Sequence, residues 1–291
     1  MYTKDGGKLD EVQRSFYEEN GFLVIRKLVS KGKLSAYESR FKEIANERVK
    51  IPGMLVQKDI SFKDQPRNEN TVYKLQELFL DEQLFDYCRT AGILDYVESF
   101  CGPDIMAVHT MLINKPPDSG TKSSRHPLHQ DLYYFPFRPA NPIVCAWTAM
   151  ETVNRENGCL VAIPGSHKGQ LLDHAYPDWE GPINSLYHGV TDTAAADQRV
   201  YLEMGPGDTV LFHPLLIHGS GANRTTGYRK AISCHYASSD CQYIDVKGTK
   251  QEDLAQEVFE IARKRFGHTI DDYSFIWKMR ATLVRGERRI L

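Results

Sequence analysis

Two histidines and an aspartate lie close together in the stretch HPLHQDLYYFPFRP, residues 126–139. His129 and Asp131 are two positions apart, so on an extended strand their side chains point to the same face. A charged carboxylate on the inner face of a β core is unfavourable unless it is paired or bound to a metal. We therefore interpret His129 and Asp131 as ligands of one metal ion, and His126 as a structural histidine.

A third ligand must come from elsewhere, and the segment LFHPLLIHGSG offers His213 and His218. His218 precedes a Gly-Ser-Gly run whose small residues leave a site accessible, whereas His213 is interpreted as structural. Two histidines and one carboxylate leave coordination positions open and form the facial triad of non-haem Fe(II) oxygenases. Zinc can use the same ligands, but a zinc hydrolase needs a nearby general base, and no HExxH motif is present.

Arg229 follows His218 after a Gly-rich turn and begins the strand-like segment RKAISCHY. A planar guanidinium binds a carboxylate through two parallel hydrogen bonds. An arginine beside an iron site with open positions could therefore hold the far carboxylate of a 2-oxo acid. Spacing alone leaves open an ordinary arginine that faces solvent at the end of a strand.

These side chains require a β core to position them. Six segments rich in β-branched and aromatic residues are bounded by Gly, Pro and Asn, and predict strands at 105–114, 142–151, 159–164, 199–204, 208–214 and 229–237. Many short strands are typical of a sandwich or barrel. The hydrophobic spacing predicts helices over 9–19, 34–49, about 72–100 and 249–267, and strands over 22–29 and 278–284.

The bulk composition indicates a single globular domain. The 291 residues are 41% hydrophobic, and we expect one domain with a helical N-terminal part (about 9–100), a β core (about 101–240) and a C-terminal helix and strand (about 249–291). A mobile loop is expected over 50–70 and a candidate lid over 173–198. The net charge of −2 gives no bias towards nucleic acid.

Other features exclude further classes of protein. The six cysteines are spread out without a CxxC pair, which predicts reduced, buried thiols. The start MYTKDGGKLDEV lacks the hydrophobic segment of a secretory signal, and no apolar stretch is long enough to span a membrane.

Longer segments resemble the phytanoyl-CoA dioxygenase family: FYEENGFLVI, SRHPLHQDLYYFPFRP, NGCLVAIPGSHKG and GDTVLFHPLLIHGSG. The similarity runs from about Leu9 to the end of the chain. It implies a mainly β fold with flanking α-helices and a double-stranded β-helix (jelly-roll, cupin-like) core. It also implies a dioxygenase that uses Fe(II), 2-oxoglutarate and O₂, with ascorbate as an auxiliary reductant. The implied substrate is a branched, phytanoyl-like fatty acyl-CoA, and the products are 2-hydroxyacyl-CoA, succinate and CO₂.

The resemblance also assigns roles by position. It implies that His129, Asp131 and His218 bind iron, and that Arg229 holds the distal carboxylate of 2-oxoglutarate with Ser220 beside it. The implied lining of the cosubstrate pocket is Lys74, Met111, Gln130 and Trp147. Without the resemblance, Lys74 would be interpreted as a solvated helix residue, and Met111 and Trp147 as core.

Several alternatives stay open at this point. The chain could hydroxylate a different small molecule, or could be a catalytically silent metal-binding protein on the same fold. Lys115, Lys122 and Arg125 lie in a Gly- and Ser-rich segment that could hold an anion such as a phosphate of CoA, or could be solvated. The aromatic side chains of 133–137 could line an acyl channel, although the core is favoured.

The location in the cell depends on the N-terminus. The resemblance implies a peroxisomal protein if a leader has been removed, and otherwise a cytoplasmic one. Oligomeric state, chain-length preference and stereochemistry are left open by the sequence.

Overall fold

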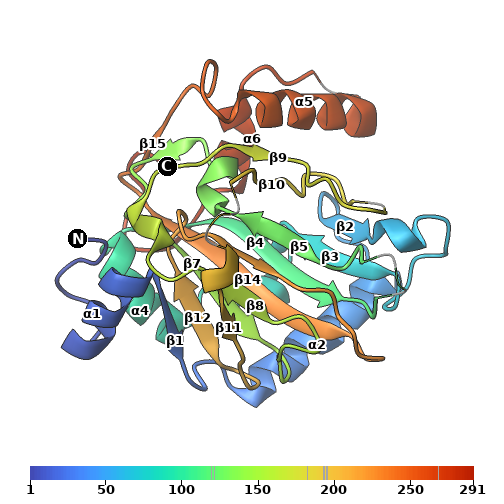
Figure 1. The fold of residues 1–291 in the computed structure, drawn as a ribbon, viewed down its shortest axis with the longest axis horizontal. Helices are drawn as coiled ribbons and strands as arrows, with labels where there is room; N and C mark the ends of the chain where they lie inside the picture. The colour runs from blue at the N-terminus through green and yellow to red at the C-terminus, as the bar shows by residue number, and fades with distance from the viewer. Residues whose placement is uncertain (119, 121, 182, 193, 195, 268) are drawn as a thin grey trace.

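The computed structural model describes residues 1–118, 120, 122–181, 183–192, 194, 196–267 and 269–291 (Figure 1). Its core is formed by two antiparallel sheets. The larger sheet has the order β1-β12-β7-β14-β4-β3-β2, with β16 also pairing with β4. Its strands are β1 Phe22–Ile25, β12 Thr209–Phe212, β7 Ile143–Ala149, β14 Arg229–Ser238, β4 Ile105–Lys115, β3 Val72–Gln76, β2 Leu55–Lys58 and β16 Thr282–Arg285.

The smaller sheet has the order β11-β8-β13-β5 and faces the larger one. Its strands are β11 Val200–Leu202, β8 Leu160–Ala162, β13 His218–Ser220 and β5 His126–His129. Two short ribbons complete the β structure: β9 His174–Ala175 with β10 Gly189–Val190, and β6 Phe137–Arg138 with β15 Gln242–Tyr243. The prediction of a mainly β core of many short strands is therefore confirmed.

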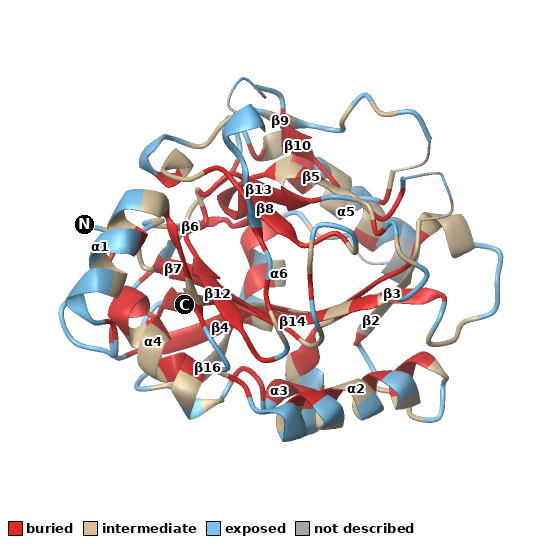
Figure 2. Cartoon of the chain, turned by 60° about the horizontal axis from the view of Figure 1, so that its bottom comes forward, coloured by how far each residue is buried: buried red, intermediate tan, exposed pale blue. Residues whose placement is uncertain are grey.

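Helices α2, α3 and α4 cover the larger sheet on the side away from the smaller one (Figure 2). The helices are α1 Glu11–Asn20, α2 Lys31–Ala45, α3 Glu82–Phe85, α4 Ala91–Cys101, α5 Glu252–Phe266 and α6 Tyr273–Arg280. Helix α2 buries Leu34, Tyr37, Phe41 and Ile44, which recur at helical spacing, in one apolar cluster with side chains of β4 and β14. Burial of each such side chain stabilises the fold by about 1.5–3 kcal/mol.

The C-terminal helices pack on the segment that follows the candidate metal ligands. Trp277 of α6 contacts the rings of Phe135 and Phe137, with centroids 5.1 and 5.9 Å apart. The buried side chain of Gln251 donates to the backbone carbonyls of Tyr133 and Phe135 at 2.9 and 3.0 Å. The C-terminal region therefore holds the turn after Asp131 in place.

Three predicted elements differ from the structure. The single helix expected over 72–100 is wrong over most of its length. Residues 72–76 form β3 and pair with β4, a 3₁₀ helix and the short α3 follow, and a longer helix begins only with α4 at Ala91. The strand expected over 278–284 begins too early, because 278–280 ends α6 and the strand β16 runs over 282–285. The expected loop at 50–70 contains β2 and a short 3₁₀ helix, Ile60–Phe62. In each case pairing or packing with distant segments decides a short stretch whose local preference is weak.

Other local predictions are confirmed. Helix α5 ends at Gly267, which adopts the left-handed conformation that glycine tolerates. All six cysteines are buried and free. No helix among the described residues is long and apolar enough to cross a membrane.

Candidate metal and cosubstrate site

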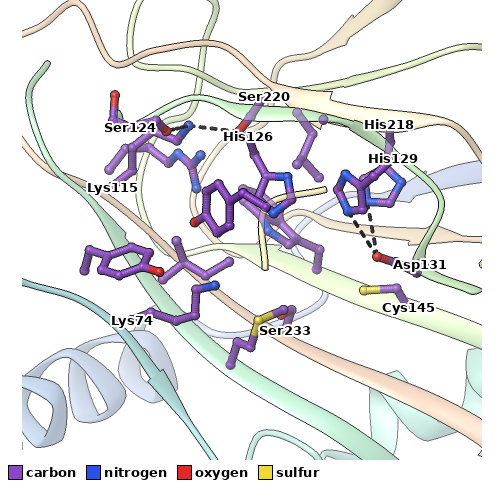
Figure 3. A pocket seen from close by; sticks show the side chains of 18 of the residues that line it. Lys74, Lys115, Ser124, His126, His129, Asp131, Cys145, His218, Ser220 and Ser233 are labelled. Atoms are coloured by element: carbon purple, nitrogen blue, oxygen red, sulfur yellow. Dashed lines mark hydrogen bonds and ion pairs between the residues drawn. The ribbon is translucent and has the colours of Figure 1, made fainter. Parts of the chain in front are cut away.

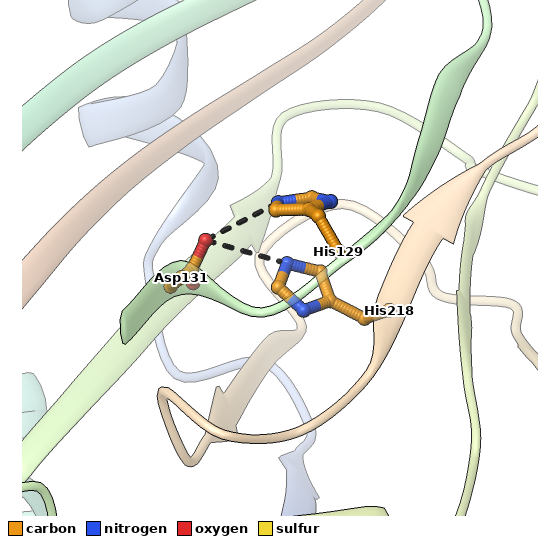
Figure 4. Close-up of side chains that lie close together, drawn as sticks. All are labelled: His129, Asp131 and His218. Carbon is orange, nitrogen blue, oxygen red and sulfur yellow. Dashed lines mark ion pairs between the residues drawn. The ribbon is translucent and has the colours of Figure 1, made fainter. Parts of the chain in front are cut away.

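His129, Asp131 and His218 meet where β5 and β13 pair. The two histidines are register partners across these strands, and all three residues are buried. Nε2 of His129 lies 3.3 Å from Oδ1 of Asp131, and Nε2 of His218 lies 3.7 Å from the same oxygen (Figure 4). Asp131 begins a short 3₁₀ helix, Asp131–Tyr134, and is not on the strand as expected. The residue between the ligands is extended, so both side chains still point the same way.

Backbone carbonyls orient both imidazoles. Nδ1 of His129 lies 2.9 Å from the carbonyl oxygen of Pro127, and Nδ1 of His218 lies 2.9 Å from that of Leu216. A carbonyl only accepts, so each Nδ1 carries the hydrogen and each Nε2 keeps its lone pair. Burial lowers the pKa of His218 to about 4, so this ring is neutral at physiological pH. Two lone pairs and a carboxylate oxygen converge in a buried space, which is a donor set that fits Fe(II).

His235 of β14 holds the carboxylate from the other side. Its Nε2 lies 2.8 Å from Oδ2 of Asp131, so Oδ1 remains directed at the two histidines. Burial alone would raise the pKa of Asp131, but the neighbouring His218 and His235 lower it well below its ordinary value. A partner of this kind fixes the orientation of a metal ligand.

Arg229 lies in the same cavity as these ligands. The cavity has a volume of about 90 Å³, and Lys74 and Ser220 lie on its wall (Figure 3). Met111 and Trp147 also line it. A buried water needs roughly 10–15 Å³, so the cavity has room for roughly six to nine water-sized groups. That volume suits a short dicarboxylate.

The guanidinium of Arg229 has few partners for a buried charge. Its side chain is only 2% exposed, and it donates one hydrogen bond, to the carbonyl of Gly158 at 2.9 Å. Its Nε has no partner, and no described carboxylate lies within ion-pair distance of it. Burial lowers the pKa of Arg229 to about 10, so it stays charged at neutral pH. A buried, unpaired cation is costly, and an anionic ligand would compensate it.

Comparison with known proteins agrees with this geometry. A protein-family model described as phytanoyl-CoA dioxygenase matches residues 17–231. The chain is 58% identical over 291 residues to the peroxisomal phytanoyl-CoA dioxygenase of Rattus norvegicus, covering 99% of this chain and 86% of that relative. The chain belongs to the phytanoyl-CoA dioxygenase family. The resemblance inferred from the sequence motifs is thereby confirmed.

Solved structures of low sequence identity share the fold of this chain. EctD from S. alaskensis, solved with 2-oxoglutarate and 5-hydroxyectoine, has a TM-score of 0.64 at 16% identity and covers 82% of this chain and 80% of its own. The epimerase SnoN, solved with Fe³⁺, alpha ketoglutarate and nogalamycin RO, has a TM-score of 0.63 at 19% identity, covering 81% and 86%. The jelly-roll core predicted for a family member is confirmed.

Gln130 does not line the cavity, although the resemblance to the family assigned it there. Gln130 lies between His129 and Asp131 on extended backbone, so its side chain points away from the side chains of these two ligands. Its Oε1 accepts from the backbone N–H of Leu172 at 2.8 Å, and its Nε2 donates to the carbonyl of Leu215 at 2.9 Å. Gln130 therefore connects the turn between the ligands to the surrounding loops.

The lysines of the cavity differ from the interpretation made from sequence alone. Lys74 is on a strand and not on a solvated helix; its Nζ lies 5.0 Å from the ring centroid of Tyr187, and burial lowers its pKa to about 8. Lys115 is not on a loop. It ends β4 and donates to Ser220 Oγ at 2.8 Å and to the Gly221 carbonyl at 2.7 Å. Burial and the neighbouring Arg229 lower the pKa of Lys115 well below its ordinary value.

The remaining histidines and aromatics act mainly in packing. The ring of His126 packs against that of His129 in a tilted arrangement, with centroids 4.3 Å apart, and lies on the cavity wall. His213 is fully buried and accepts from the backbone N–H of Leu215 at 3.1 Å. Phe135 and Phe137 are each 1% exposed in an apolar cluster and do not line the cavity, which supports the core interpretation.

His235 is the main site residue that the sequence reasoning missed. A signal existed, because His235 lies an even number of positions after Arg229 on the same predicted strand. Even spacing on a strand places both side chains on one face. Arg229, Ser233 and His235 all line the cavity.

Proposed function

We propose that this chain is an Fe(II)- and 2-oxoglutarate-dependent dioxygenase that hydroxylates the carbon next to the thioester carbonyl of a branched, phytanoyl-like fatty acyl-CoA. The products are 2-hydroxyacyl-CoA, succinate and CO₂. The observation that carries the proposal is one buried cavity lined both by a two-histidine, one-carboxylate cluster and by Arg229, which has no ion-pair partner among the described residues. The name of the rat relative supports the choice of substrate.

His129, Asp131 and His218 would hold the iron through two Nε2 atoms and one carboxylate oxygen. When bound, iron and 2-oxoglutarate supply the activation of O₂, which leads to succinate, CO₂ and the hydroxylated substrate carbon. The protein contributes fixed ligand orientations. The two Nδ1–H groups are held by backbone carbonyls, and the second carboxylate oxygen of Asp131 is held by His235.

Arg229 would pair with the distal carboxylate of 2-oxoglutarate. Its Nε lacks a partner, and a carboxylate accepting from the guanidinium edge would satisfy it. Its charged face lies 5.3 Å from the ring centroid of Trp147, which fixes the plane of the fork. Ser220 lines the same cavity and is oriented by the hydrogen bond from Lys115, and Lys74 and Met111 form further parts of the wall.

The proposal extends to organisation and location. We propose one domain over 1–291, because side chains from α1 to β14 share one apolar cluster. We also propose that the protein acts in the peroxisome, where its rat relative is named as residing. An acyl-CoA and O₂ are the expected partners.

Succinate release tests the function. Purified protein with Fe(II), 2-oxoglutarate and ascorbate is given 3-methyl-branched acyl-CoA, straight-chain acyl-CoA, or the matching free acids. We expect succinate and 2-hydroxyacyl-CoA with the branched thioester, and neither product from Asp131→Ala. Activity on free acids without activity on thioesters would assign the chain to another small molecule. No 2-oxoglutarate turnover with any substrate would support a catalytically silent metal-binding protein.

A further inference from the structure

A second and larger cleft lies on the outer side of the smaller sheet. Its volume is about 800 Å³, and Leu128 of β5 and Val161 of β8 lie on its wall. Residues of the segment 173–198, the insert that carries β9 and β10, form another part of the wall, and β10 lies beside β5 (Figure 2). His126 and Ser220 line both this cleft and the cosubstrate cavity, so the two spaces adjoin.

The wall of this cleft is strongly basic, although the whole chain is slightly acidic. Its charged lining residues are Arg125, Arg155, Arg199, Arg224 and Asp178. Arg224 is neutralised by Glu156, with a nitrogen–oxygen distance of 3.0 Å. The other three arginines form no ion pair with any described carboxylate. The cleft therefore concentrates positive charge that the protein itself leaves uncompensated.

Aromatic rings hold two of these arginines in fixed planes. The guanidinium carbon of Arg125 lies 3.7 Å from the ring centroid of Trp179, and that of Arg155 lies 4.4 Å from that of Tyr201. A stacked guanidinium loses less freedom when its N–H edge binds a phosphate. The stacking partners come from the insert and from β11, so the insert contributes directly to the arrangement.

We propose that this cleft binds the nucleotide end of the CoA thioester, with the arginines on its diphosphate and 3′-phosphate. The inference rests on the proposed function. The small cavity suits a dicarboxylate and is too small for CoA, whereas the cleft has the volume of a typical ligand site. The pantetheine arm would pass His126 and Ser220, the residues shared by both spaces, and deliver the acyl carbon to the metal ligands.

Substrate truncation tests this assignment. The ratio of kcat/KM for acyl-CoA to that for the matching acyl-pantetheine, which lacks the nucleotide, is measured in wild type, Arg155→Gln and Arg199→Gln. Each variant is expected to lower the ratio by about tenfold, the loss of one charge-assisted phosphate contact. The exposed Arg48→Gln is the control, because it changes the net charge equally and should leave the ratio unchanged. Equal losses on both thioesters, or an unchanged ratio, would overturn the assignment.

Direct binding separates this inference from the proposed function. Calorimetry with 3′-phosphoadenosine 5′-diphosphate should show binding to wild type and loss in the Arg155→Gln, Arg199→Gln double variant. ADP should bind more weakly, and inorganic phosphate should not compete at the same concentration. Equal binding of the nucleotide to wild type and double variant, or full competition by inorganic phosphate, would refute a CoA site. Absence of hydroxylation with every thioester would refute the proposed function, and the calorimetric result would still decide the role of the cleft.

Discussion

Replacing Arg229 with methionine should impair binding of 2-oxoglutarate without weakening the fold. The guanidinium is 2% exposed, lacks an ion pair with any described residue and leaves Nε without a partner. Burial lowers its pKa to about 10, which means that folding disfavours the charged form at neutral pH. This pKa shift corresponds to a free-energy cost of about 3 kcal/mol for burying the charged guanidinium in the absence of ligand. Removing the charge should therefore leave the Tm of the ligand-free protein equal or higher.

The loss caused by Arg229→Met should appear in the binding of 2-oxoglutarate. Truncating one member of a buried, hydrogen-bonded charge pair typically costs about 2–5 kcal/mol. A loss of about 3 kcal/mol corresponds to an increase on the order of 100-fold in the KM for 2-oxoglutarate. The KM is measured by succinate release at saturating acyl-CoA, and the Tm by calorimetry without ligand.

Arg138→Met is the matched control. Arg138 donates to the carbonyls of Phe135 and Phe137 at 2.8 and 2.9 Å, so its partners belong to the fold. This variant should lose Tm and keep its KM for 2-oxoglutarate. An Arg229→Met protein with an unchanged KM and a lowered Tm would refute the reasoning, because Arg229 would then be a structural residue like Arg138.

Three further outcomes follow from the geometry. His235→Ala should weaken Fe(II) binding by about 10- to 100-fold in an anaerobic titration, and unchanged affinity would contradict its role as the partner of Asp131. Gly219→Ala should weaken Fe(II) binding at least as much, because a Cβ at position 219 would lie 2.8 Å from a backbone oxygen of β5. Gly221→Ala is the control, because a Cβ at position 221 has open space and this variant should bind Fe(II) normally. Equal Fe(II) affinities of the two variants would refute this prediction. Asp208→Asn should lower the free energy of unfolding by about 1–3 kcal/mol at neutral pH. Burial raises the pKa of Asp208, but hydrogen bonds from Arg26 and backbone N–H groups lower it overall. The difference in free energy of unfolding between wild type and Asp208→Asn should therefore vanish as the pH falls through the lowered pKa. A difference that does not change with pH would contradict this role of the Asp208 carboxylate.

The sequence predicts the metal cluster well because its chemistry is local. His129 and Asp131 are separated by one extended residue, and His218 stands at the start of a short strand beside them. Successive side chains on extended backbone point to opposite faces, so Gln130, between the two ligands, points away from the cavity that the resemblance assigned to it. The same rule places His235 on the face of Arg229 and could have identified it from the sequence. In these cases residue type and strand periodicity are sufficient.

Other features depend on contacts between distant segments. The ammonium group of the buried Lys115 finds its acceptors at the end of β13, in Ser220 and Gly221, about a hundred residues later in the chain, and no local pattern shows them. Residues 72–76 carry helix-like spacing, yet pairing with β4 makes them a strand. The arginines of the larger cleft are far apart in the chain and meet only when the insert folds over the smaller sheet.

The coupling of succinate formation to substrate hydroxylation tests the central claim most directly. The protein is incubated with Fe(II), 2-oxoglutarate, O₂ and a 3-methyl-branched acyl-CoA, and both products are quantified by mass spectrometry. We expect equal amounts of succinate and 2-hydroxyacyl-CoA, and neither product from Asp131→Ala. Full product formation by Asp131→Ala, or succinate without the 2-hydroxylated thioester, would contradict the central claim.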